Sequence, residues 1–578
     1  MHRGIRPATL RRPRLVPFLP LLTGLLLATA LPAQAATLVT DVKGWTATAT
    51  AAETHEQVAS QRFTALLIDA GGRVVALGND AEALRARALT LEEPIAEVDG
   101  DGRFLMPGFI DAHGHFTSLG YDALRLNITG LRSLGETVAR IRAHADAGGS
   151  SGARGWITGG RWNQEHWPES RFPTAADLDG ITDRPIWLRR VDGHAAWANA
   201  AAMRAAGITR DTQDPDGGQI IRDDDGEPTG VFVDTAMGLI DAAVPEPDDE
   251  TLRAAIREAQ RIMLSKGQVQ VHDAGAGKRE IDMFRAMADA GELEVRLYVM
   301  LAGARTLAHY PGPIDDPDEQ VVLRSVKLVA DGALGSRGAA LFEDYADDEG
   351  NRGLLITGPE EIGRVVDEAA ARGFQVGVHA IGTRANQLVL DAYEDVMARD
   401  PGSRALRHRV EHSQILVPSD IERYAQLGVV ASMQPTHQSS DMFMAVKRLG
   451  ARRLGGSYAW QALLASGAVL ALGSDFPVEP PDPMFGVHAA VTRQNRDNEP
   501  PGGWRSHDAL TLEQTLRGFT LDAAWAAHQE DALGSLEPGK WADFVLLEED
   551  PFAIAPQDLW KVAVSETWVA GERRYAAP

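Results

Sequence analysis

The 578-residue chain contains no cysteine. This absence excludes disulfide bonds, a thiol nucleophile, thiolate metal ligands and a lipid-modified N-terminal cysteine. Any metal ion that the protein binds must therefore be held by His, Asp, Glu or a modified Lys side chain. A chain of this length exceeds one ordinary hydrophobic core, so we expect one large domain with an accessory domain or an insertion.

Acidic residues and long apolar runs are both absent from the first 35 residues, where only a short apolar segment occurs. Five arginines precede the stretch LLTGLLLATAL, Leu21 to Leu31, and the small-residue motif AQA follows at Ala33 to Ala35. This order predicts a signal peptide, residues 1–35, that is cut after Ala35. An uncleaved membrane anchor is the alternative, although the apolar core is short for a bilayer. RRPR at Arg11 to Arg14 leaves Sec and twin-arginine export both open.

Positive charge is scarce in the remaining chain. Removing five arginines from 57 basic residues leaves 52 against 81 acidic residues, a formal charge of −29. Such a surface repels nucleic acid and anionic membranes, so neither is expected as a partner after signal cleavage. We expect a periplasmic or secreted protein that acts on a small molecule, and a homodimer stays open.

The sequence pattern divides the mature chain into a β-rich part at each end and a βαβ-rich middle. Short alternating strands predict one small β domain built from residues 36–105 and 526–578. Residues 106–525 alternate apolar runs with amphipathic helices, which indicates parallel βαβ units. Eight runs are candidate strands: Met106 to His113, Gln268 to His272, Val295 to Leu301, Ser325 to Val329, Gln375 to His379, Arg409 to His412, Val429 to Met433, and Val469 to Asp475.

These units predict an α/β fold: a (β/α)8 TIM-like barrel with a small β-sandwich domain from both chain ends. A large insertion, about residues 120–247, follows the first barrel strand. The five tryptophans of this insertion could line a pocket or form its own core.

Polar side chains occur in or at the ends of several predicted strands. They are His113, His115, Lys327, His379, His412 and Asp475. The carboxyl ends of barrel strands converge on one face, and residues i and i+2 share a side of a strand, so His113 and His115 could hold one ion together. Any one histidine alone could be a core residue, Lys327 could be a salt-bridged lysine and Asp475 a turn residue. Their recurrence at matching strand ends favours a metal site.

The chain resembles the amidohydrolase superfamily, and within it the family-3 branch that includes N-substituted formamide deformylase. The motifs that carry this resemblance are PGFIDAHGHF, RPIWLRRVDGHAAWANAAAM, GEPTGVFVD, VKLVADGALGSRGAAL, VGVHAIGTRAN, RVEHSQIL, SMQPTH, GSDFPVEPPDPMFGVHAAV and GSLEPGKWADFVLL. They span nearly all of the mature chain. One position departs from the family pattern, because Thr383 stands where an Asp usually follows HAIG.

The resemblance implies a site with two divalent ions, expected to be Zn²⁺. By similarity, His113, His115 and Asp475 hold one ion, His379 and His412 hold the other, and a carboxylated Lys327 bridges them. The implied reaction is attack of a metal-bound hydroxide on a carbonyl, with Asp475 as general acid and base. His194 is implied to face the substrate, and capping of a strand in the insertion is its alternative role.

The expected activity is therefore hydrolysis of a non-peptide C–N bond in an amide or N-substituted formamide. Hydrolysis of a cyclic amide or of an ester or lactone on the same site is a second hypothesis. A third is a secreted binding protein on a catalytically degenerate barrel. D-aminoacylase-type chemistry is disfavoured, since that pattern uses a cysteine ligand.

Overall fold

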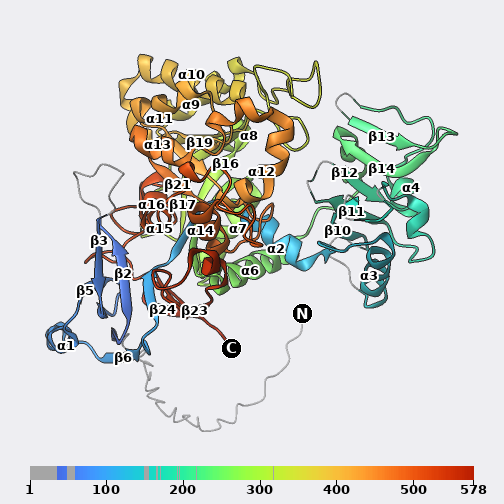
Figure 1. The fold of residues 1–578 in the computed structure, drawn as a ribbon. Coiled ribbons are helices and arrows are strands. Elements are labelled where there is room, and N and C mark those ends of the chain that lie inside the picture. The colour runs from blue at the N-terminus through green and yellow to red at the C-terminus, as the bar shows by residue number, and fades with distance from the viewer. Residues whose placement is uncertain are drawn as a thin grey trace, which may run out of the picture.

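Eight parallel strands form one sheet in the middle of the chain (Figure 1). In sheet order they are β8 Phe109–Gly114, β15 Gln268–Ala276, β16 Arg296–Ala302, β17 Val321–Val329, β18 Gln375–Ala380, β19 Arg409–His412, β20 Val430–Met433 and β21 Leu470–Leu472. The last strand returns to the first, because the backbone N–H of Asp475 donates to the carbonyl of His113 at 2.7 Å. The sheet thus closes into a (β/α)8 barrel, which confirms the predicted fold class.

The computed structural model describes most of the chain. The described residues are 35–48, 59–148, 155–164, 167–169, 171–191, 193, 195–215, 218–316 and 318–578. The expected signal peptide, except Ala35, lies outside them, as does His194. Within the described residues, every helix is too short or too polar to cross a membrane.

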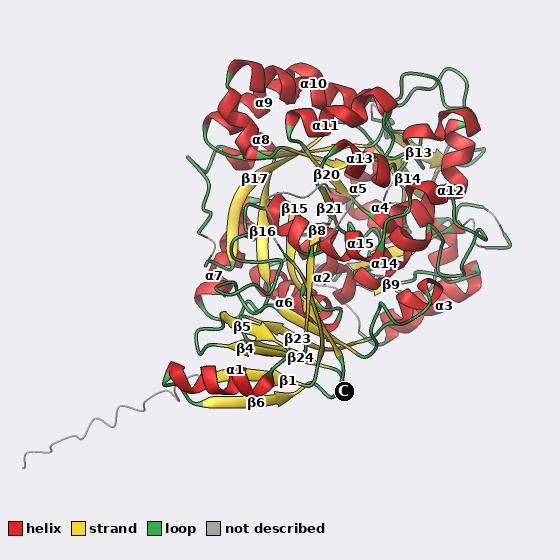
Figure 2. Cartoon of the chain, turned by 60° about the vertical axis from the view of Figure 1, so that its left-hand side comes forward, coloured by secondary structure: helices red, strands yellow, loops and turns green. Residues whose placement is uncertain are grey.

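Helices cover the outside of the barrel (Figure 2). They include α6 Asp249–Ser265, α7 Lys278–Asp289, α8 Gly303–Leu307, α9 Pro359–Ala371, α10 Thr383–Arg399, α11 Ile421–Leu427, α12 Pro435–Leu449, α13 Trp460–Ser466, α14 Pro483–Thr492, α15 Leu512–Gly518 and α16 Leu521–Ala526. Helix α6 shows why the pattern predicts them. Asp248 caps its N-terminus by accepting from the N–H of Thr251, and Leu252, Ile256 and Met263 are buried on one face. Helical spacing of apolar residues and a carboxylate cap together specify this element.

The first predicted strand is two strands in the structure. Residues Phe104–Pro107 form β7 in a different sheet, and the barrel strand β8 begins only at Phe109. Gly108 separates them, and a Cβ at this position would lie 2.3 Å from Cγ1 of Val269. The turn between the two sheets therefore requires a glycine.

Two small sheets are built from the ends of the chain, one from N-terminal strands alone and one from strands of both ends. One sheet has the order β5 (Val74–Gly78), β4 (Ala65–Ile68), β1 (Ala36–Thr40) and β6 (Ile95–Asp99). The other has the order β24 (Glu572–Ala576), β23 (Val564–Val569), β22 (Phe544–Leu547), β7, β2 (Lys43–Ala47) and β3 (Ser60–Phe63). They share a core in which Leu66 and Ile68 of β4 pack in one cluster with Phe544 and Trp568. This is the predicted β-sandwich; helix α1, Ala81–Ala88, lies beside it.

The insertion after β8 has its own six-stranded sheet, at the right of Figure 1. The strand order is β13 (Gly218–Arg222), β14 (Pro228–Asp234), β12 (Ala195–Ala198), β11 (Ile186–Arg190), β10 (Ile157–Trp162) and β9 (Leu126–Asn127). Helices α3 Leu134–Asp146, α4 Ala200–Ala205 and α5 Gly238–Asp241 belong to this region. Its five tryptophans are all buried and belong to its two core clusters, so they serve mainly as core residues.

A buried histidine near the start of β19 makes the free energy of unfolding depend on pH. His408 precedes β19, accepts a hydrogen bond from the N–H of Val376 at 3.0 Å and stacks on Tyr393 at 4.9 Å. Burial, with a smaller contribution from His528, lowers the pKa of His408 to about 3. As pH falls below the ordinary value of 6.5, the unfolded chain takes up this proton before the folded chain does. Folding stability is therefore lost on acidification, by about 1.4 kcal/mol per pH unit for this group.

We predict that His408→Asn flattens the fall in unfolding free energy between about pH 6 and pH 4. The asparagine oxygen can still accept from Val376, but it has no proton to gain in this range. Urea unfolding at several pH values measures the effect. His507→Asn, at a histidine whose side chain is 67% exposed, is the control. Parallel pH profiles of wild type and His408→Asn would contradict the prediction.

Candidate metal centre

The HxH motif lies where β8 ends and helix α2, Phe116–Leu124, begins. His113 is buried within β8, and His115, the residue just before α2, has a side chain that is 36% exposed. The loop after β21 holds this segment by two hydrogen bonds, from the N–H of Asp475 to the carbonyl of His113 and from the N–H of His115 to the carbonyl of Phe476, each 2.7 Å. The backbone thereby fixes both imidazoles against Asp475.

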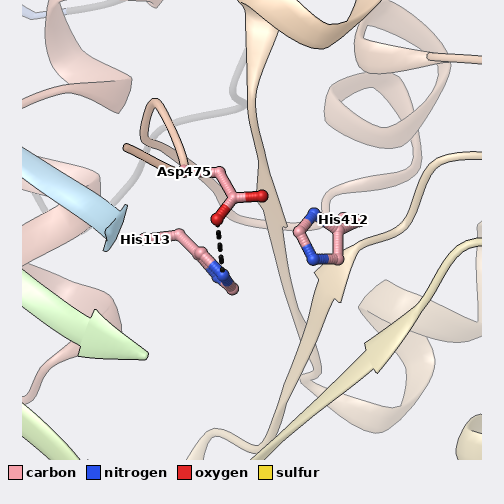
Figure 3. Close-up of side chains that lie close together, drawn as sticks. All are labelled: His113, His412 and Asp475. Carbon is pink, nitrogen blue, oxygen red and sulfur yellow. Dashed lines mark ion pairs between the residues drawn. The ribbon is translucent and has the colours of Figure 1, made fainter. Parts of the chain in front are cut away.

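The carboxylate of Asp475 lies close to both histidines of the HxH motif. Its Oδ1 lies 3.6 Å from Nε2 of His113 (Figure 3). The same oxygen lies 3.3 Å from Nε2 of His115. The residue lies beyond the end of β21, in a loop with φ of 61°. A left-handed backbone is costly for a residue with a Cβ, and such strain is concentrated at functional sites.

His379 and His412 come from the ends of β18 and β19. Their ring centres are 4.5 Å apart, and the ring of His412 is 4.8 Å from that of His113. His412 has φ of 75°, and its Nδ1 lies 2.8 Å from Oε1 of Gln434. Nε2 of His379 lies 3.7 Å from a carboxylate oxygen of Asp331. The fifth and sixth barrel strands, β18 and β19, thus bring their histidines to the place where the first strand, β8, brings His113.

Lys327 lies on β17 with 8% of its surface exposed. It forms no hydrogen bond or ion pair with any described residue, and burial lowers the pKa of its ammonium, opposed by Glu411 and Asp475. Its charge in turn helps to lower the pKa of His113, His379 and His412, which places it within electrostatic reach of all three. A buried lysine with no partner is expensive, so its environment favours neutralisation.

The donor atoms at this point suit a divalent cation. One ligand atom from each of His113, His412 and Asp475 lies within 4.8 Å of the others. Nε2 of His113, Nε2 of His379 and Oδ1 of Asp475 are buried and have no hydrogen-bond partner among the described residues. Burial lowers the pKa of His113 to about 4 and those of His379 and His412 well below the ordinary value, so these rings are neutral. Neutral imidazoles with a carboxylate form a divalent-metal site.

A buried charge network orients His113, and the sequence reading missed it. Nδ1 of His113 lies 2.6 Å from Oε2 of Glu411, and Nε of Arg409 donates to Oε1 of Glu411 at 2.8 Å. Burial favours protonated Glu411, but Arg409 and His113 outweigh it and hold the pKa well below its usual range. The carboxylate thus fixes Nδ1–H and leaves Nε2 free for a metal. The sequence signal for this network was the motif RVEH, in which Arg409 and Glu411 occupy two inward positions of one barrel strand.

We predict that Glu411→Gln weakens metal binding by about 10- to 100-fold, because the amide no longer holds His113 as an anion does. The measurement is competition with a chelator of known affinity on folded protein. Asp543→Asn is the matched control. It breaks another buried pair, in which Nε of Arg296, the first residue of β16, donates at 2.7 Å to Asp543, the residue before β22. If both variants lose the same affinity, Glu411 acts through stability alone.

A histidine that the sequence analysis also missed, His437, holds the second carboxylate oxygen of Asp475. Nε2 of His437, in the first turn of α12, lies 3.2 Å from Oδ2 of Asp475, and its Nδ1 lies 3.4 Å from Glu479. Burial alone would lower the pKa of His437, but these two carboxylates raise it to about 10. Asp475 is also buried, yet the nearby imidazole of His115 and the hydrogen bond from His437 hold its pKa well below the usual range. His437 therefore keeps Asp475 ionised; its signal was the quoted motif SMQPTH.

The loop after His379 is held by a carboxylate from the loop that follows the neighbouring strand, β17. Asp331 accepts from the N–H groups of Ile381 at 2.9 Å and Gly382 at 2.8 Å. Thr383, at the family's usual Asp position, accepts from the N–H of Phe342 at 3.2 Å. The hydroxyl of Thr383 thus pins the loop that leads to Phe342.

A closed parallel barrel with imidazole and carboxylate ligands at the carboxyl ends of its strands defines a metal-dependent barrel hydrolase. The chain belongs to the amidohydrolase family (Amidohydro_3), whose sequence profile matches residues 96–575.

Relatives support this assignment along most of the chain. The protein LONG AFTER FAR-RED 3 of Arabidopsis thaliana is 35% identical over 497 residues, which cover 83% of each chain. N-substituted formamide deformylase of Arthrobacter pascens is 28% identical over 523 residues, 87% of this chain and 94% of the relative. A solved structure of an uncharacterized metal-dependent hydrolase from Pyrococcus furiosus is 27% identical with a TM-score of 0.72, covering 89% of this chain and 99% of that one.

Proposed function

We propose that the protein hydrolyses a non-peptide C–N bond, in an amide or N-substituted formamide of a small molecule. The observation that carries the proposal is the position of Asp475, an ionised carboxylate within 3.6 Å of two imidazole nitrogens at the barrel mouth. Similarity to N-substituted formamide deformylase supports the bond type. Acyl transfer to water needs a proton acceptor and an electrophilic site at one point, and this cluster provides both.

Divalent ions held here would supply Lewis acidity, lowering the pKa of water and polarising the substrate carbonyl. Asp475 accepts the proton of the attacking water and then delivers it to the leaving nitrogen. The water oxygen becomes part of the released acid, and the C–N bond breaks to release an amine. His437 fixes Oδ2 of Asp475, so Oδ1 is the oxygen turned toward His113 and His115.

We further propose that the metal is Zn²⁺ and that two ions bind. The two pairs of histidines, His113 with His115 and His379 with His412, offer two sets of nitrogen ligands around Asp475 and Lys327. Imidazole and carboxylate ligands suit zinc, and a carbamate on Lys327 would supply the anion that a pair of dications requires. The five nitrogen and oxygen ligands without cysteine are consistent with this choice.

A substrate screen tests the proposed function. The protein is purified with metal analysis, loaded with Zn²⁺ and assayed against N-alkylformamides, other amides, lactams and lactones, with a chelator-treated sample beside it. We expect turnover of formamides or open-chain amides that the chelator abolishes. If only lactones or lactams are hydrolysed, the proposed bond type is wrong. If the protein is active without bound metal, the proposed metal site is wrong.

We also propose that the protein is exported, because residues 1–35 carry five arginines and no acid before a short apolar segment. The mature chain should then begin near Ala36, outside the cytoplasm. N-terminal sequencing of protein from the native cell decides this. A cytoplasmic protein that retains Met1 would overturn it.

A further inference from the structure

An arginine-rich cavity of about 270 Å³ lies between the insertion and the barrel mouth. Its charged lining consists of four arginines, Arg125, Arg161, Arg189 and Arg190, and two aspartates, Asp122 and Asp241. The whole chain has the opposite balance, with 57 basic against 81 acidic residues. A local excess of guanidinium groups in an acidic protein attracts anions.

The cavity adjoins the catalytic loop. Its wall includes Pro477 and Val478, two and three residues after Asp475. An extended chain spans at most about 3.6 Å per residue, so Pro477 lies within about 7 Å of Asp475. Arg161 of β10 connects the two regions, since it donates to the carbonyls of Pro477 at 2.6 Å and Val478 at 3.1 Å. A molecule bound at Asp475 could therefore extend into this cavity.

The two aspartates of the lining are already paired. Asp241 accepts two hydrogen bonds from Arg189, at 2.9 and 3.0 Å, and one from Trp187 at 2.8 Å. Asp122 lies 3.3 Å from Arg161. Arg190 donates to the neutral side-chain oxygens of Gln164 and Asn163. The carboxylates of the lining therefore neutralise Arg161 and Arg189.

Arg125 is left without an anion. It follows the C-terminus of α2 and stacks on Tyr121 at 4.6 Å, yet no described carboxylate lies within ion-pair distance of it. Burial lowers the pKa of its guanidinium, opposed mainly by Asp122. Arg125 also lines a second cavity, of about 590 Å³, whose acids Glu246, Asp248 and Glu250 come from the segment that begins α6. A half-buried guanidinium that lines two cavities and has no ion-pair partner among the described residues favours a carboxylate ligand.

We infer that this cavity is a substrate subsite and that Arg125 binds a carboxylate of the substrate, remote from the bond that is cleaved. The inference rests on the proposed function and narrows its substrates to amides with an anionic tail. Because α2 rises about 1.5 Å per residue, the Cα of Arg125 lies about 15 Å from that of His115. The substrate must therefore be extended, with several bonds between the amide and the carboxylate.

The test compares an acid with its neutral counterpart: 6-formamidohexanoate and 6-formamidohexanamide, with N-formylglycine as the short acid. Binding is measured by calorimetry on Asp475→Asn protein, whose turnover should be at least about 100-fold slower than that of the wild type. The constants kcat and KM are measured on protein that keeps Asp475. The variants are Arg125→Gln, Arg125→Lys as the charge-preserving form, and Arg364→Gln on α9 as a surface control, its side chain being 52% exposed.

We expect Asp475→Asn protein to bind 6-formamidohexanoate about 10- to 100-fold more tightly than the amide, the usual effect of a charged hydrogen bond. Adding Arg125→Gln should remove the preference, Arg125→Lys should restore part of it, and Arg364→Gln should leave it intact. In the catalytically intact protein, Arg125→Gln should raise KM for the acid with little change for the amide. N-formylglycine is too short to reach Arg125, so Arg125→Gln should leave its binding unchanged.

Equal binding of acid and amide, or a preference that survives Arg125→Gln, would overturn the subsite even if both compounds are hydrolysed. If neither compound is hydrolysed but the acid binds through Arg125, the proposed function fails and the subsite remains.

Discussion

Asp475→Asn should lower kcat by about 100- to 10,000-fold, the usual range for loss of a general acid and base. Asparagine keeps the size of the side chain and one oxygen ligand, but it can neither take a proton from water nor return one to the leaving nitrogen. The fold should persist, because Asp475 lies in the loop beyond β21 and not in the packed interior of the barrel. Steady-state kinetics and thermal unfolding measure the two effects.

The control for this change is Asp558→Asn, an aspartate with a side chain 51% exposed that pairs only with Lys561 at the surface. It should leave turnover intact. Metal analysis accompanies both variants, since a loss of ions from Asp475→Asn would show that its role as a ligand dominates. Should Asp475→Asn retain a tenth or more of the wild-type kcat, another group must carry the proton.

The barrel was predictable from the sequence because its strands are short apolar runs spaced by amphipathic helices. Val376 and Val378 of β18 and Val410 of β19 are fully buried, as a strand covered on both faces requires. The ends of the first strand were less predictable. FLMPGFI is apolar throughout, so its pattern does not show that Phe104–Pro107 pairs with β22 in another sheet while Phe109 begins the barrel. Only the Pro-Gly step marks the change.

The histidines were predictable because each ends a strand that faces the same end of the barrel. His437 and Glu479 were not, since His437 reaches Asp475 from a helix and Glu479 reaches His437 from a loop, and only the packed structure determines the directions of that helix and loop. Glu411 was overlooked for another reason: it lies next to His412 in sequence, but it contacts Nδ1 of His113 and Arg409, whereas the His412 ring lies 4.8 Å from the His113 ring within the ligand cluster. Residues i and i+2 share one side of a strand, which brings Arg409 and Glu411 together, but the φ of 75° at His412 departs from the extended backbone on which alternation depends.

In the proposed two-ion centre, Lys327 is the residue that would bridge the ions. The ammonium is buried beside three neutral imidazoles, and burial lowers its pKa, which increases the share of neutral amine. A neutral amine can add carbon dioxide: the nitrogen forms a bond to carbon and releases one proton. The resulting carbamate is an anion with two oxygens, which suits a bridge between two cations. The adduct and the ions should therefore stabilise each other.

We predict that Lys327→Ala lowers metal occupancy below that of the wild type and nearly eliminates turnover. Lys327→Arg distinguishes a lysine that bridges the ions as a carbamate from a lysine that acts only as a structural cation. Arginine keeps a positive charge but stays protonated, so it cannot form a carbamate. If Lys327 acts only as a structural cation, arginine should preserve activity; if it acts as a carbamate, arginine should fail as completely as alanine.

Three measurements together decide between these readings: metal content, kcat, and a high-resolution structure of the zinc-loaded wild type. The structure should show three additional non-hydrogen atoms on the Lys327 amine, in contact with both ions. Growth of protein with ¹³C-labelled bicarbonate should give a carbamate signal that Lys327→Ala lacks. A Lys327→Ala protein that keeps both ions and full turnover would make the lysine structural, and the remaining ligands, His113, His115, His379, His412 and Asp475, would then be expected to hold a single ion.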